Sequence, residues 1–147
     1  MIANIVGATL FAYAIAHSHI FDANVRAAMV ELGKHALAPN FWTIVVRGIF
    51  AGWLIALMVW LLPAAENEKL GTILIVTYIV GVGGFSHIIA GSVEALYAVA
   101  AGAASWGQYL GGFLLPVFIG NSIGGVALVS LLNYGQVAPE GPESAAP

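Results

Sequence analysis

Four long apolar stretches, each almost free of charged residues, constrain this chain more than any other feature. The stretches at 41–62 and 71–101 each contain a single charged residue, Arg47 and Glu94, and those at 1–21 and 113–132 contain none. A membrane-spanning helix requires about 20 mainly apolar residues. Only 7% of the chain is charged, against about 25% in soluble domains. The sequence therefore predicts an all-α integral membrane protein and excludes a soluble globule.

These stretches predict a membrane domain over residues 1–137, with four spans at about 1–21, 41–62, 71–101 and 113–132. Residues 22–40 carry charges at helical spacing, which favours a short amphipathic segment at the interface. Residues 138–147, rich in Pro, Glu and Ala, are expected to form a disordered C-terminal tail. The net charge of −3 gives no indication of a nucleic-acid partner, so the expected surroundings are the lipid bilayer.

The third stretch is interrupted at its centre. The segment Gly81-Val82-Gly83-Gly84-Phe85-Ser86-His87 places three glycines and an ionisable side chain at mid-membrane depth. Concentrated glycines favour unwound backbone, which is tolerated at this depth only where protein or a water-filled cavity satisfies it. We therefore expect two half-helices, at about 71–82 and 88–101, with a break near 83–87.

His87 is the leading functional candidate, because ionisable groups inside a membrane are rare and usually face a cavity or pathway. With a reference pKa of about 6.5, its imidazole can pass a proton or donate a hydrogen bond to an anion. A half-helix that starts at Ile88 adds free N–H groups and a positive dipole end. These features predict a site for a small anion. The alternative is a neutral histidine bonded to a backbone carbonyl as a structural contact.

Polar or small residues near His87 extend this site. Gly91 and Glu94 follow it at i+4 and i+7, so the three share one face of the second half-helix. Glu94 is either a pore-lining carboxylate or proton partner, or a polar contact at headgroup level. Arg47 either attracts anions at a vestibule or snorkels and pairs structurally. Lys34, before the second span, is either an attractor at the pore mouth or a plain interfacial lysine.

No constellation for catalysis is found. The chain has no cysteine and contains no phosphate-binding loop, zinc-protease or serine-hydrolase motif. His17 and His19, at i and i+2, point in different directions on a helix. We therefore expect no enzyme activity, no metal and no cofactor. Gly120, Gly124 and Ala127 have the small-xxx-small spacing that permits close helix packing.

A short internal repeat suggests a larger symmetry. The pattern Asn4-Ile5-Val6-Gly7 is echoed by Asn121-Ser122-Ile123-Gly124. Membrane transporters are often built from inverted repeats with broken helices at corresponding positions. If the last three spans form one repeat, the first span is the last helix of the other. On this expectation, two helices that belong before Met1 are missing.

Three separated motifs resemble the formate/nitrite transporter family. They are the segment 47–60, the segment Gly84-Phe85-Ser86-His87 and the segment 115–125. The resemblance extends to Gln136 and covers the C-terminal half to two thirds of a family member. It implies six-helix subunits with an aquaporin-like inverted repeat, assembled as pentamers with one pore per subunit. It also implies a bacterial inner-membrane location, a cytoplasmic C-terminus, and passage of small monovalent anions such as formate, nitrite or hydrosulfide.

The resemblance assigns roles to individual positions. It makes His87 the pore histidine, places Phe85 in the constriction, and aligns Lys34 near the lysine that precedes the fourth helix of the family. The chain also departs from the family pattern at three pathway positions, which are Ser86 in place of a glutamate, and Gly52 and Gly91 in place of asparagines.

Two hypotheses about function remain open at the level of sequence. The first is an anion channel or transporter subunit, with or without a coupled proton, because the motifs coincide with an ionisable residue at a glycine break. The second is a truncated or non-transporting membrane assembly subunit, because the helices implied by the repeat are missing. The departures at Ser86, Gly52 and Gly91 leave the identity of the anion open under either hypothesis.

Overall fold

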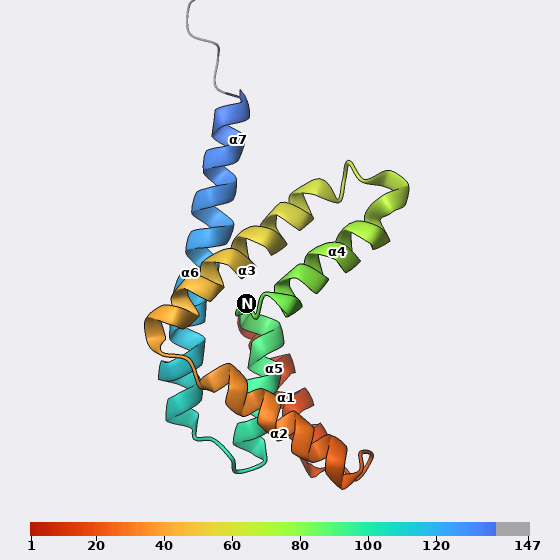
Figure 1. The fold of residues 1–147 in the computed structure, drawn as a ribbon, viewed down its shortest axis with the longest axis vertical. Coiled ribbons are helices and arrows are strands. Elements are labelled where there is room, and N and C mark those ends of the chain that lie inside the picture. Colours follow the sequence, from red (N-terminus) through yellow and green to blue (C-terminus); the bar gives the residue numbers. More distant parts are fainter. Residues whose placement is uncertain (138–147) are drawn as a thin grey trace, which may run out of the picture.

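The computed structural model describes residues 1–137, so the tail predicted at 138–147 lies outside the described residues. Every regular element in the described part is helical. The principal helices are α1 (Ile2–His17), α2 (Ala23–Leu37), α3 (Phe41–Leu61), α4 (Lys69–Val82), α5 (Ile88–Ala100), α6 (Leu115–Ser122) and α7 (Val129–Val137). A short 3-10 turn, Glu66–Glu68, leads into α4. One π-helical segment, Gln108–Leu114, precedes α6, and a second, Ile123–Leu128, joins α6 to α7, so that the four form one long helix (Figure 1).

Polar side chains fix where several helices begin. The Asp22 carboxylate accepts a hydrogen bond from Val25 N at 2.9 Å, and the Asn40 side chain accepts one from Thr43 N at 2.9 Å. Such caps satisfy N–H groups that have no partner within the helix. They explain the start of α2 within the predicted amphipathic segment and the start of α3 at the predicted second span.

The last long helix begins before the predicted start at 113. Ser105 and Gln108 form a capping box, in which Gln108 N donates to Ser105 Oγ at 3.2 Å and Ser105 N donates to Gln108 Oε1 at 2.8 Å. The pair Gly111-Gly112 then continues as π-helix instead of ending the segment. At the other end of the chain, α1 ends at His17, short of the predicted boundary at 21.

The helices pack in two groups around α5 and α6. Helices α1 and α2 both pack on α5, whereas α3 packs along α6 and the π-helical segment that follows it (Figure 1). Helix α4 lies beside α3 and contains no buried residue. The apolar core lies where the groups meet, between α5 and the helix that starts at the capping box. Its largest fully buried apolar side chains include Tyr109, Phe113, Ile44, Leu96 and Val117.

Many apolar side chains remain exposed, as is expected of a surface that faces a membrane or another protein. The exposed set includes Leu74, Ile75 and Tyr78 on α4. Two helices of the described chain, Phe41–Leu61 and Gln108–Leu132, are long and apolar enough to cross a membrane by length and composition. Ile2–His17 and Ile88–Ala100 are apolar but shorter. The number of spans therefore stays a prediction.

Glycines allow α3 and α6 to approach closely. Gly48 and Gly52 on α3 face Gly120 and Asn121, and a Cβ atom at Gly120 would lie only 2.9 Å from the Cα of Gly48. A Cβ at Gly52 would lie 2.6 Å from the Cα of Asn121. Gly120 and Gly124, the small-xxx-small pair, are thus packed against α3, whereas Ala127 is exposed.

We predict that Gly120→Ala destabilises this contact, because the added methyl group meets the α3 backbone. Overpacking of this kind costs about 1–3 kcal/mol, so thermal unfolding in detergent, followed by tryptophan fluorescence, should occur at a lower temperature. Gly71→Ala is the matched control, since a Cβ there meets nothing within 4 Å. Equal melting temperatures for Gly120→Ala and the unchanged protein would contradict the packing argument.

Candidate functional site

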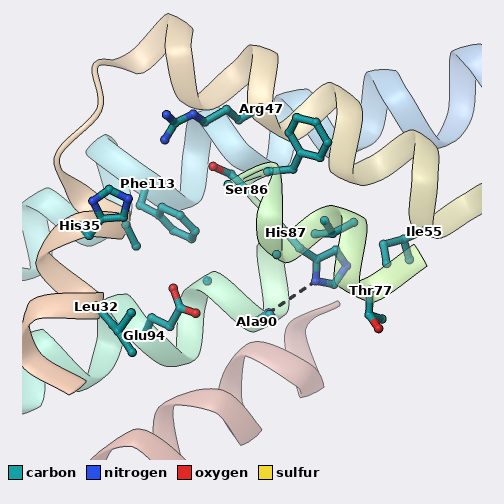
Figure 2. Close-up of a pocket in the computed structure, with 16 residues that line it drawn as sticks. Leu32, His35, Arg47, Ile55, Thr77, Ser86, His87, Ala90, Glu94 and Phe113 are labelled. Carbon is teal, nitrogen blue, oxygen red and sulfur yellow. Dashed lines mark hydrogen bonds between the residues drawn. The ribbon is translucent and has the colours of Figure 1, made fainter. Parts of the chain in front are cut away.

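A cavity of about 480 Å³ lies beside the helix break, between α2, α3, α4 and α5 (Figure 2). It is lined by six of the residues singled out from the sequence, namely Arg47, Phe85, Ser86, His87, Gly91 and Glu94. Apolar side chains such as Leu32, Ile55, Val80 and Phe113 cover much of the remaining wall. The structure thus brings most of the predicted site residues to one cavity.

The wall at the break is built from irregular backbone. Helix α4 ends at Val82, and Gly84 has φ +59, a left-handed conformation that favours glycine. Phe85 N donates to Val80 O at 3.0 Å, which folds the break back onto α4. The Phe85 ring stacks on Phe50 of α3, with 5.2 Å between centroids. The break is therefore an ordered corner that presents an aromatic ring to the cavity.

The Asn121 side chain holds this corner in place. Its Nδ2 donates to Ser86 O at 2.9 Å and to Gly48 O at 3.0 Å, and its Oδ1 accepts from Ile88 N at 3.0 Å. One amide thus bridges α6, α3 and both sides of the turn into α5. Backbone groups left free by unwinding must find partners at membrane depth. Asn121 provides such partners for Ser86 and Ile88.

His87 occupies the N-cap of α5. Its Nδ1 accepts from Ala90 N at 3.5 Å, which in a neutral ring leaves the proton on Nε2. The ring lines the cavity near Thr77 and Ile55 (Figure 2). The N–H groups of Ile88 and Ala90 are already occupied by Asn121 and His87. The expectation that the start of α5 offers free N–H groups is therefore wrong for these two, because side chains of the chain itself cap them.

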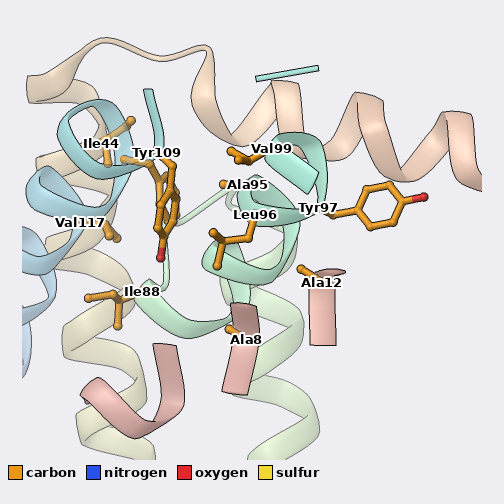
Figure 3. Packing of buried hydrophobic residues seen from close by; sticks show 11 residues of the cluster. Ala8, Ala12, Ile44, Ile88, Ala95, Leu96, Tyr97, Val99, Tyr109 and Val117 are labelled. Atoms are coloured by element: carbon orange, nitrogen blue, oxygen red, sulfur yellow. The ribbon is translucent and has the colours of Figure 1, made fainter. Parts of the chain in front are cut away.

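The apolar core supports α5 on the side away from the cavity. Ile88, Leu96 and Tyr109 are buried within it (Figure 3). Tyr109 also donates a hydrogen bond from its hydroxyl to Ser92 Oγ at 3.0 Å, and Ser92 is fully buried. Ser92 is accordingly a packing residue and not part of the cavity wall. These contacts fix the helix face on which His87, Gly91 and Glu94 lie.

Two predicted site residues lie outside the cavity wall. Lys34 is exposed and forms an ion pair with Glu31 at 2.8 Å. On α2 the residues that face the cavity are Leu32, His35 and Ala36, at the i, i+3, i+4 spacing of one helix face, and Lys34 points elsewhere. Gly52 is buried against Asn121 between α3 and α6.

The structure adds three residues that sequence reasoning missed: His35, Thr77 and Asn121. The charges of residues 22–40 predict a helix but do not indicate which of its faces lines a cavity, so nothing in the sequence distinguishes His35. The signal for Asn121 was present, since it is the amide in a glycine-rich apolar run. A buried amide in such a run requires hydrogen-bond partners, and the nearby break supplies them.

The chemistry of the cavity wall suits the binding of a small molecule. It combines an apolar wall with few polar groups, chiefly Arg47, His35, His87 and Glu94. Within residues 1–137 there is no cluster of three or more His, Cys, Asp or Glu that could hold a metal ion. An apolar cavity with a few basic groups suits a small, weakly hydrated anion.

The chain belongs to the formate/nitrite transporter family, whose family model matches residues 1–135. It is therefore a membrane protein of a transporter family and not of an enzyme family. It is 34% identical over 137 residues to the inner membrane protein YfdC of Escherichia coli K12, covering 93% of this chain and 44% of that protein.

Two further relatives come from Bacillus species. The chain is 31% identical to the uncharacterized transporter YrhG of Bacillus subtilis, over 90% of this chain and 51% of that protein. It is 29% identical to the formate channel BtFdhC of Bacillus thuringiensis, over 89% of this chain and 51% of that protein. The chain thus spans about half the length of the curated relatives that it matches. No solved structure matches it significantly.

We predict that Asn121→Leu loosens the break, because the carbonyl of Ser86 and the N–H of Ile88 lose their partner. Loss of these contacts should cost about 2 kcal/mol locally, which corresponds to roughly 30-fold faster hydrogen exchange over residues 83–91 by mass spectrometry. Ser122→Ala, at the next position, is the control, because the Ser122 hydroxyl makes no hydrogen bond to another described residue. Unchanged exchange in Asn121→Leu would show that the amide does not hold the corner.

Proposed function

We propose that this chain forms part of a pathway by which small monovalent anions, of the formate or nitrite kind, cross a membrane. The observation that carries the proposal is the position of His87. It lies at a helix break on the wall of a largely apolar cavity that also contains Arg47. Membership of the formate/nitrite transporter family supports the same function.

Physical chemistry explains why a histidine suits this position. A bare anion that enters an apolar passage loses its hydration, which is costly unless hydrogen bonds or an opposite charge replace it. His87 first gains a second proton, with Nδ1 giving up its contact with Ala90 N, and the resulting imidazolium donates a hydrogen bond from Nε2 to the anion. Full transfer of that proton leaves a neutral imidazole and a neutral acid. The neutral acid crosses the apolar constriction at Phe85 more easily. The imidazole then takes up another proton from the water of the cavity.

The proposal also covers how the chain folds and assembles and in which membrane it lies. We propose an aquaporin-like inverted repeat, a pentameric assembly and a place in the bacterial inner membrane with a cytoplasmic C-terminus. The exposed apolar residues of α4, including Leu74, Ile75 and Tyr78, support burial of that face in lipid or against further protein. Coupling to a proton follows from the role given to His87.

Anion flux in proteoliposomes tests the role of His87. We predict that the unchanged protein takes up formate faster as the external pH falls from about 8 to 6, because histidine side chains gain a proton in this range. In His87→Ala the rate of formate uptake should be at least tenfold lower and should no longer depend on pH. His19→Ala is the matched control, because His19 is exposed and lies outside the cavity.

Two outcomes would contradict the proposal. Unchanged pH-dependent uptake in His87→Ala would remove the role of the histidine. Uptake by the unchanged protein no greater than in empty liposomes would remove the transport function and favour the alternative of a non-transporting assembly subunit.

A further inference from the structure

We propose that Glu94 is a specificity-determining residue of the cavity: its carboxylate competes with incoming small anions for the basic groups Arg47 and His35, which line the same space. This inference rests on the proposed function. It adds that the Glu94 carboxylate is a fixed negative charge in the cavity. An incoming anion is therefore repelled by Glu94 as well as attracted by the basic groups.

The packing of α2 on α5 places Glu94 near His35. Gly33 on α2 lies against α5 so closely that a Cβ there would be 2.7 Å from the Cβ of Ala98 and 3.2 Å from the carbonyl carbon of Glu94. With the two helices this close, His35 on α2 and Glu94 on α5 line the same cavity. Figure 2 shows the Glu94 carboxylate directed into this cavity, with His35 and Arg47 on neighbouring elements.

The three ionisable groups are close enough to share a cavity but are not locked in ion pairs. Within the described chain the ion pair is Lys34–Glu31, on the outer surface of α2. Neither Arg47 nor Glu94 makes a side-chain hydrogen bond or an ion pair with another described residue, although both line the cavity. The basic groups are therefore available to a mobile anion, and Glu94 is the fixed anion that competes with it.

The surrounding groups do not cancel the charge of Glu94 by contact. The polar side chains that line the cavity with Glu94 come from several elements: His35 from α2, Arg47 from α3, Thr77 from α4, and Ser86 and His87 from the break. With both histidines neutral, the formal charges of Arg47 and Glu94 balance. A cavity with no net charge attracts bare anions less than one with a free arginine, because the two fields oppose each other.

The sharpest test measures formate uptake at fixed pH in proteoliposomes and formate binding by calorimetry in detergent. We expect Glu94→Gln to lower both KM and Kd for formate about three- to tenfold at low salt, with kcat changed less than twofold. The gain should shrink near 1 M salt, where the screening length falls to about 3 Å. Glu94→Asp keeps the charge, so its Kd for formate should show the same dependence on salt as that of the unchanged protein and lack the gain seen in Glu94→Gln.

Two further variants separate charge competition from a general effect. Glu68→Gln makes the same charge change in the turn before α4, outside the cavity wall, and should leave KM unchanged. In the His35→Gln background the effect of Glu94→Gln should be smaller, since one of the contested groups is gone.

An unchanged or raised Kd for formate in Glu94→Gln, or an effect that does not depend on salt, would overturn the inference. Failure of the proposed function is seen separately, as absent uptake by the unchanged protein. Tighter formate binding by Glu94→Gln would then still support competition within the cavity.

Discussion

The hydrogen bonds of one amide, Asn121, connect the helix break beside the cavity to the neighbouring helices α3 and α6. Unwound backbone is expensive in a membrane because no water is present to satisfy it. At the break the Asn121 side chain donates a hydrogen bond to Ser86 O and accepts one from Ile88 N, and it also donates to Gly48 O on α3. Without these bonds nothing described would hold both ends of the break to the same neighbouring helix. The position of His87 follows from this arrangement.

Small residues make this bridge geometrically feasible. Asn121 reaches α3 because Gly48, Gly52 and Gly120 let the two helix backbones approach closely. Gly33 does the same between α2 and α5. Glycine therefore has two uses in this chain. At Gly84 it permits a left-handed turn, and elsewhere it sets the distances between helices that enclose the cavity.

Sequence reasoning predicted the features that depend on local pattern. The all-helical class follows from long apolar stretches, and the interruption at 83–87 follows from concentrated glycines beside His87. The last helix begins before residue 113, the start predicted for the fourth span, because the Ser105–Gln108 capping box starts the helix and a π-helical segment continues it through Gly111-Gly112. Contacts between distant elements, such as Asn121 with Ser86, could not be predicted. They depend on how the helices pack, which periodicity does not specify.

The central claim is that the helix break presents His87 to a space that small anions reach. The chain has no cysteine, so His87→Cys creates a single reporter thiol. The measurement is its rate of modification by a small anionic methanethiosulfonate in liposomes, with Ala98→Cys, at a fully buried position between α2 and α5, as the unreactive control. The account predicts that His87→Cys is modified and that added formate slows the reaction. An unreactive thiol, or a rate unaffected by formate, would contradict it.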